Sequence, residues 1–82
     1  MAYAILLTTE AREQLRALPN DLRRDIGFRL EGLQKNFAGD IKKLEGAGNR
    51  YRLRVGIYRV LFRLDAGTME VYAVKQRKNA YD

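Results

Sequence analysis

Polar and apolar residues alternate most regularly in the second half of the chain, from residue 50 onwards. Tyr51, Leu53 and Val55 share one parity, and arginines occupy the positions between them. Because successive side chains of a strand point to opposite faces, this pattern predicts a strand with one apolar and one basic face. The alternation pauses at Gly56 and then resumes. We therefore expect strands at residues 50–55, 57–64 and 69–75, joined by turns at Gly56 and at residues 65–68.

The first half of the chain has the spacing of helices instead. A short apolar run at residues 2–7 predicts a buried strand. Thr8 and Thr9 then offer a hydroxyl cap to a first helix, and Pro19 ends that helix or opens a second, for which Asn20 is a possible N-cap. The helical faces are defined by Ala11, Leu15 and Leu18, and then by Leu22, Ile26, Leu30, Leu33 and Phe37.

Two glycines interrupt the second helix, at Gly27 and Gly32. Each weakens a helix by about 1 kcal/mol relative to alanine. The alternative is that they permit close packing against the first helix.

These elements predict a single α+β domain over residues 1–82. Its order is an N-terminal strand, a two-helix hairpin and then an antiparallel meander sheet, with a short extended segment at residues 41–44 before the meander. The helices must cover one face of the sheet, and we expect the other face, with the arginines, to stay open. A chain of 82 residues supports only a modest core.

Composition narrows the chemistry considerably. The chain has no cysteine and no histidine, which excludes a disulfide framework, a zinc site, a Ser-His-Asp triad and a histidine-based ribonuclease mechanism. Residues 1–40 hold six basic and six acidic residues, whereas residues 41–82 hold ten basic and four acidic ones, so the net charge of +6 belongs to the second half. A concentrated basic surface predicts an anionic partner, and nucleic acid is the first candidate.

The longest apolar run near the N-terminus, at residues 4–7, is too short for a signal peptide or a membrane span. We therefore expect a cytoplasmic protein that does not contact a membrane.

Three segments of the chain resemble a known family. They are Lys43-Leu44-Glu45-Gly46, the stretch YRLRVGIYRVLF at residues 51–62, and Gln76-Arg77-Lys78-Asn79-Ala80-Tyr81. Together with the N-terminal strand and helices, they are similar to the RelE branch of the RelE/ParE toxin superfamily over essentially the whole chain. The resemblance implies a RelE-like fold and a toxin of a type II toxin–antitoxin system.

The implied activity is that of a ribosome-dependent messenger-RNA endoribonuclease, which enters the decoding site, cuts the codon there and stops translation. The resemblance also implies a cognate RelB-like antitoxin, which we expect to be acidic and partly disordered before it binds. Operator DNA is expected to be contacted only through the antitoxin complex. No cofactor is implied, and cleavage is expected to be independent of metal.

The resemblance places the catalytic residues on two strands and on the C-terminal segment. Arg52 and Arg54 match the two basic positions of the strand that follows the loop, and Arg59 matches the arginine of the next strand. Arg59 is the strongest candidate for binding the scissile phosphate, because a guanidinium grips phosphate through two parallel donors. Arg77 is expected to stabilise charge at the leaving oxygen, and Tyr81 to stack on a base or orient the nucleophile.

General attraction to RNA is expected from Arg50, Lys43, Lys75 and Lys78. Tyr51 and Tyr58 share the parity of the apolar residues, so we expect them to pack rather than to stack on RNA.

The chain departs from the family pattern at two places. Arg52 and Arg54 stand where relatives often carry lysine, and Gln76 stands where they often carry histidine. Because arginine is a poor base, either Tyr81 or ribosomal RNA assists the reaction, or cleavage is slow. Two other functions stay open: a ParE-like inhibitor of DNA gyrase, although that branch generally lacks these basic residues, and a non-catalytic module that binds nucleic acid or antitoxin.

Overall fold

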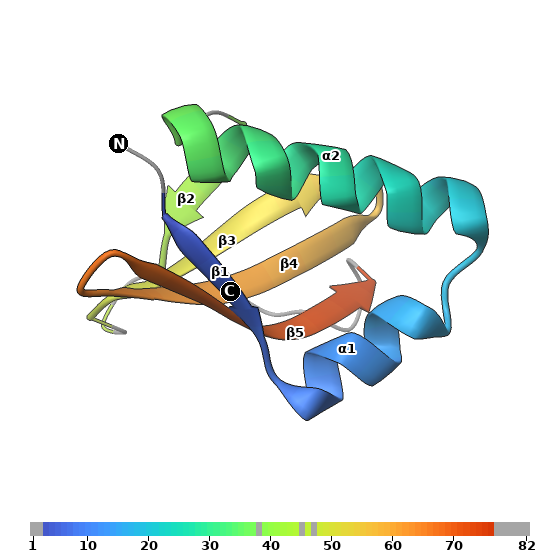
Figure 1. Ribbon diagram of the computed structural model, residues 1–82, viewed down its shortest axis with the longest axis horizontal. Helices are drawn as coiled ribbons and strands as arrows, with labels where there is room; N and C mark the ends of the chain where they lie inside the picture. The colour runs from blue at the N-terminus through green and yellow to red at the C-terminus, as the bar shows by residue number, and fades with distance from the viewer. Residues whose placement is uncertain (1–2, 38, 45, 47, 77–82) are drawn as a thin grey trace.

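A computed structural model describes residues 3–37, 39–44, 46 and 48–76, in which two helices lie on one side of a five-stranded sheet (Figure 1). The elements are β1 (Ala4–Leu7), α1 (Thr9–Arg16), α2 (Asn20–Asn36), β2 (Asp40–Lys43), β3 (Arg50–Val55), β4 (Tyr58–Asp65) and β5 (Thr68–Gln76). The strand order is β1-β5-β4-β3-β2, antiparallel except for the parallel pair of β1 and β5. The predicted α+β fold, with a strand, two helices and a meander, is confirmed.

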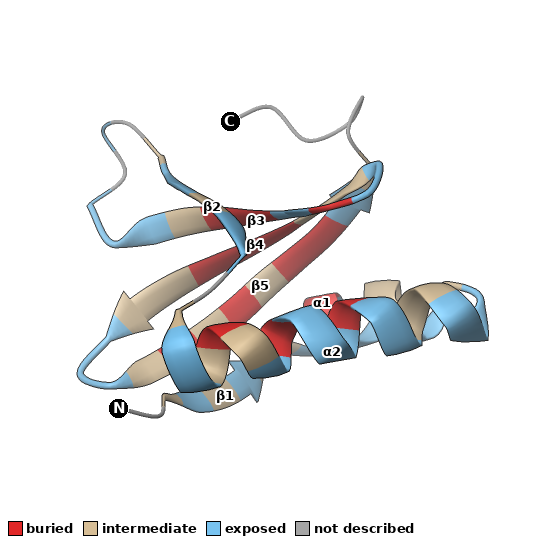
Figure 2. Cartoon of the chain, turned by 90° about the horizontal axis from the view of Figure 1, so that it is seen from above, coloured by how far each residue is buried: buried red, intermediate tan, exposed pale blue. Residues whose placement is uncertain are grey.

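The core lies between the sheet and the two helices, where the buried residues of both layers face each other (Figure 2). Phe62 is fully buried on β4, and its ring stacks on that of Tyr51 with 5.6 Å between the centroids. Phe37, which follows α2, meets both rings edge-on. The buried residues of this cluster are Ala11, Ile26, Leu30, Leu33, Leu53, Val55, Val60, Phe62, Met69, Val71 and Val74.

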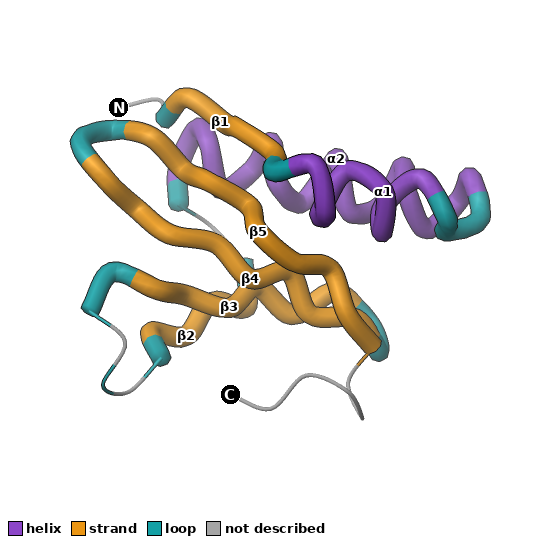
Figure 3. Tube along the Cα trace, turned by 90° about the horizontal axis from the view of Figure 1, so that it is seen from below, coloured by secondary structure: helices purple, strands orange, loops and turns teal. Residues whose placement is uncertain are grey.

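β1 is an edge strand and not the buried strand that its apolar run predicts. It pairs only with β5, at the edge of the sheet opposite to β2 (Figure 3). Exposed and half-buried residues alternate along it, and Leu6 is 57% exposed. The prediction was wrong because a short apolar run does not distinguish a strand covered on both faces from one covered on a single face.

The two helices begin in different ways. Thr8 caps α1 as predicted, since its hydroxyl oxygen accepts a hydrogen bond from the backbone N–H of Ala11 at 3.1 Å. The prediction of Asn20 as a cap was wrong: Pro19 occupies the N-cap position of α2, and the Asn20 side chain accepts a hydrogen bond from Arg23. Proline suits this place because it has no N–H to leave unsatisfied.

Gly27 does not serve close packing, because a Cβ added there would meet no atom within 4 Å. Within the described ranges, neither helix combines the length and the apolar character needed to cross a bilayer.

Two tight turns hold the meander together. Gly56 and Ile57 connect Val55 to its register partner Tyr58, and Ala66 and Gly67 connect Asp65 to Thr68. Ala66 and Gly67 both have positive φ, at 49° and 80°, as the commonest two-residue hairpin turn requires. The predicted turns are therefore confirmed. β3 has the predicted bounds, whereas β4 is shifted by one residue and β5 is longer by one residue at each end.

Candidate functional site

The register of β3, β4 and β5 places three cations side by side on the sheet face away from the helices. Arg54 lies directly opposite Arg59, and Arg59 lies directly opposite Lys75. We call these three residues the cationic row. Directly opposed residues have Cβ atoms about 5 Å apart, so three long basic side chains can reach a common anion. The predicted arginine face is confirmed, because the neighbours Leu53 and Val60 are buried on the helix side. Contrary to the prediction, this face is not open throughout, because it includes the buried residues Arg52, Leu61 and Ala73.

Asp40, on β2, lies at the edge of the cationic row. It is the register partner of Arg54, whose Nε is 3.7 Å from Asp40 Oδ2. Its other carboxylate oxygen lies 3.9 Å from Nη1 of Arg52. The carboxylate therefore orients two arginines and lowers the net charge at this edge. Sequence reasoning missed Asp40, because only the register of β2 brings it beside the arginines.

Arg52 differs sharply from Arg54 in exposure. Its side chain is only 6% exposed, whereas that of Arg54 is 48% exposed. Its register partners on the same face are Lys42 and Leu61. Charged side chains are almost never this buried unless they are paired, which fits the contact with Asp40. Of the two arginines predicted to be catalytic on β3, Arg54 is the one with an accessible guanidinium.

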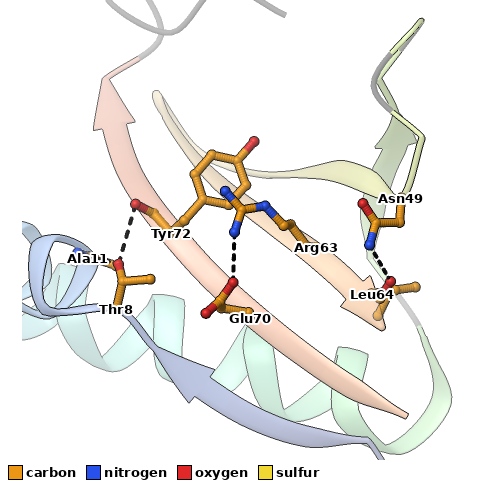
Figure 4. Close-up of polar contacts among 7 residues, drawn as sticks. All are labelled: Thr8, Ala11, Asn49, Arg63, Leu64, Glu70 and Tyr72. Atoms are coloured by element: carbon orange, nitrogen blue, oxygen red, sulfur yellow. Dashed lines mark hydrogen bonds and ion pairs between the residues drawn. The ribbon is translucent and has the colours of Figure 1, made fainter. Parts of the chain in front are cut away.

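The other end of the same face holds a different arrangement, shown in Figure 4. Arg63 donates a hydrogen bond to Glu70 at 2.7 Å, and its guanidinium carbon lies 4.6 Å from the centroid of the Tyr72 ring. The guanidinium carbon of Arg50 lies 5.9 Å from the same centroid. We call these four residues the stacked cluster. Sequence reasoning placed Arg50 and Arg63 on this face but missed Glu70 and Tyr72.

A β-bulge in β5 decides what stands on the arginine face. Leu61 pairs with Ala73, whereas the next residue, Phe62, pairs with Val71. The extra residue, Tyr72, lies where strict alternation is interrupted, and both it and Ala73 stand on the arginine face. In a regular strand Lys75 would share the parity of buried Val71; the bulge places it opposite Arg59 instead. The consecutive apolar residues Ala73 and Val74 are the sequence signal of this break.

The remaining predicted site residues are only partly brought together. Lys43 is the register partner of Tyr51, on the parity of the core, so Lys42 and not Lys43 shares the face of the arginines. Arg77, Lys78 and Tyr81 lie outside the described residues.

Tyr51 and Tyr58 lie on the helix side of the sheet. Tyr51 packs against Phe62, which confirms the prediction that it is a packing residue. Tyr58 is half-buried, and its hydroxyl oxygen accepts a hydrogen bond from the Gln76 side chain at 3.4 Å. Among the described residues, no three metal-ligating side chains gather in one place.

Comparison with known proteins identifies relatives of this chain. No protein-family model matches the chain. Toxin RelE3 of Methanocaldococcus jannaschii is 33% identical in an alignment of length 75 that covers 85% of this chain and 85% of that toxin. The RelB-RelE antitoxin–toxin complex from Methanococcus jannaschii matches with a TM-score of 0.78 and 31% identity over 90% of this chain and 92% of that one. The archaeal RelE-RelB complex from Pyrococcus horikoshii OT3 matches with a TM-score of 0.82 and 26% identity over 98% and 100%. The resemblance seen in the sequence is confirmed, and the chain belongs to the RelE toxin family.

Proposed function

We propose that this chain is the toxin of a type II toxin–antitoxin pair and acts as a ribosome-dependent messenger-RNA endoribonuclease. The observation that carries the proposal is the cationic row, in which Arg54, Arg59 and Lys75 come from three adjacent strands. RNA contains its own nucleophile, the 2′-hydroxyl. A protein that cuts it must align that group, stabilise the charge of the pentacoordinate phosphorane and manage two proton transfers.

Arg59 is the best placed residue for the scissile phosphate, because it lies in the middle of the cationic row. Its guanidinium offers two parallel N–H donors to the phosphate oxygens. Arg54 on one side and Lys75 on the other would neutralise the additional negative charge of the phosphorane. Cations held in place by a sheet need no reorganisation during the reaction, which is what makes such stabilisation effective. We propose that they replace a metal ion in this role.

The proton transfers need a group other than the arginines of the cationic row. Arginine does not deprotonate at physiological pH, and the chain contains no histidine. In this proposal the proton acceptor is Tyr81 or a group of the ribosomal RNA, and Arg77 faces the leaving oxygen. Dependence on the ribosome then has a chemical reason beyond alignment of the messenger, because the arginines of the cationic row supply charge but no base.

The proposed partner of the toxin is an acidic, RelB-like antitoxin. Several solved structures that match this chain are complexes of a RelE toxin with a RelB antitoxin, and the net charge of +6 favours an acidic chain that folds on binding. Binding over the arginine face would block access to RNA. We further propose that the pair acts in the cytoplasm and meets operator DNA only through the antitoxin.

Primer extension on a messenger translated in a cell-free system tests the nuclease. We expect cuts in register with the codons, present only with ribosomes, and lost in Arg59→Ala. Arg29→Ala is the matched control, because Arg29 is a half-exposed arginine on α2 whose partner is Asp25. Cuts that persist in Arg59→Ala would contradict the assigned role, and an intact messenger would contradict the nuclease. DNA breaks with an intact messenger would indicate gyrase inhibition instead.

A non-catalytic binding module is the second candidate, and one observation favours it. Arg52, a predicted catalytic residue, is buried, and it shares the carboxylate of Asp40 with Arg54. Such an arrangement holds arginines as fixed cations, which suffices for binding. This candidate predicts that the toxin protects or retains RNA without cutting it in the same assay.

A further inference from the structure

We propose that the stacked cluster is a second nucleotide-binding subsite, in which an unpaired base of single-stranded RNA stacks on the guanidinium of Arg63. The inference rests on the proposed function in one respect only, since it takes RNA to be the ligand of the arginine face. It adds a site for a base at a distance from the phosphate site at Arg59. Neither the family resemblance nor the cationic row assigns it.

Two contacts hold the plane of the Arg63 guanidinium. Glu70 accepts a hydrogen bond from its Nη1 at 2.7 Å, and the ring of Tyr72 lies 4.6 Å from its central carbon. The Arg63 and Glu70 side chains remain 39% and 41% exposed, so the pair is accessible to a ligand. In Figure 4 the guanidinium lies across the face of the Tyr72 ring. A base that stacks on a guanidinium already fixed in this way loses less side-chain entropy than one that must order a free arginine.

The charges of the stacked cluster favour a base over a phosphate. Glu70 compensates the charge of Arg63 at hydrogen-bond distance, and a phosphate placed there would be repelled by the same carboxylate. A base is uncharged and has a flat π-surface, and single-stranded RNA is commonly bound through stacking on arginine planes and aromatic rings. Arg50, 5.9 Å from the Tyr72 ring centroid, leaves one cation for the phosphate of the stacked nucleotide.

The position of the stacked cluster fits a strand of RNA that also occupies the cationic row. Arg50 and Arg54 are four residues apart on β3, and Arg59 and Arg63 are four residues apart on β4. Four residues of a strand span about 13 Å, and residues four apart point to the same face. The two sites thus lie on one face of the same two strands, at a separation that a few nucleotides bridge.

Binding of a short oligonucleotide to the full chain, without ribosomes, tests the subsite. The probe is a 2′-O-methyl hexanucleotide, which resists cleavage because its 2′-oxygen is blocked, in six further versions that each lack one base. We expect one abasic position to weaken binding by about 5- to 150-fold, as stacking of one base is worth about 1–3 kcal/mol. Fluorescence anisotropy at fixed salt gives the dissociation constants.

Three variants separate stacking from fold and charge. Arg63→Lys keeps the charge and a partner for Glu70 but removes the plane, so the abasic penalty should disappear. Tyr72→Phe keeps the ring and should keep the penalty. Arg59→Ala should weaken binding of all probes alike and leave the penalty in place. Thermal unfolding of each variant verifies that the sheet is intact.

Either of two results would overturn the subsite: no abasic penalty in the original chain, or a penalty that survives Arg63→Lys. The second would mean that the base stacks on another group, such as Tyr81, and not on Arg63. Failure of the subsite is distinguishable from failure of the nuclease, since codon-register cutting on the ribosome is measured independently of this probe.

Discussion

At one end of the arginine face, Arg54 and Arg59 lie beside Lys75, with the carboxylate of Asp40 at the edge. At the other end, Arg63 is ion-paired with Glu70, and its guanidinium lies over the ring of Tyr72. Arginine offers a permanent charge with a fork of donors, and also a flat surface that stacks. The neighbours decide which property is available to a ligand. The first end is suited to an anion, and the second to an uncharged planar group.

The contrast also concerns what each end contributes to the fold. Like charges directly opposite each other on a sheet are destabilising, so the pairing of Arg54 with Arg59 costs stability. Arg63 also faces one like charge, Arg50, but it pairs with Glu70 on its other side, whereas Arg59 has a cation on both sides. Substitutions at the two ends should therefore separate activity from stability in opposite directions, and the core beneath them provides the reference.

The largest effect is expected from Phe62→Ala, on the helix side of β4 between the two ends. Phe62 is fully buried and stacks on Tyr51, and removal of such a ring costs about 3–5 kcal/mol of unfolding free energy. In a domain of this size a loss that large unfolds the sheet, so that the cationic row and the stacked cluster are lost together. Urea denaturation followed by circular dichroism measures it. Phe28→Ala, at a site that is 70% exposed, is the control and should change stability by less than about 0.5 kcal/mol.

Arg59→Ala should break the cationic row while the fold persists. Loss of one well-placed donor to a developing negative charge typically lowers the rate by about 10²–10³. We expect a fall of this size in ribosome-dependent cleavage, with unfolding free energy equal to or slightly above that of the original chain. A parallel Arg63→Ala variant should lose far less activity. Equal losses at Arg59 and Arg63 would refute the distinction between the two ends.

Asp40→Asn should make the cationic row bind RNA more tightly. Removing the carboxylate leaves Arg54 and Arg52 without their negative neighbour on β2, which raises the positive charge offered to RNA. The pair of Asp40 with Arg54 is about half exposed, and an exposed ion pair is worth at most about 1 kcal/mol, so we expect the hexanucleotide to bind about two- to fivefold more tightly at low salt. Asp25→Asn on α2 is the control for net charge. Weaker binding would instead identify Asp40 as the residue that positions the arginines.

The smallest effect is expected from Glu70→Gln in the stacked cluster. The ion pair with Arg63 is partly exposed, so its loss should lower unfolding free energy by about 0.2–1 kcal/mol. Because salt screens exposed charges, the difference from the original chain should shrink between 0.05 and 1 M salt, values at which the Debye length falls from roughly 14 to 3 Å. Urea denaturation at both concentrations measures this. A difference that is independent of salt would show that packing, and not charge, is what Glu70 contributes.

Much of the fold could be predicted because the relevant signals are local. Alternation over residues 50–55 indicates a two-faced strand, Thr8 has the chemistry of a helix cap, and Gly67 suits a turn with positive φ. The same alternation predicts the arginine face, since parity within a strand does not depend on the rest of the chain. The exposed edge position of β1 was not predictable in this way, because it depends on which strand β1 pairs with and on which layer covers it.

The candidate site was predicted in its residue types but not in its neighbours. By itself the sequence determined that Arg54, Arg59 and Arg63 stand on one face. Only the tertiary structure decided that Lys75 joins them, through the bulge at Tyr72. It also decided that Asp40 and Glu70 lower the net positive charge at the two ends of the face. The physical reason is that side-chain direction is set residue by residue along a strand, whereas register and bulges are set by pairing between strands that lie far apart in the chain.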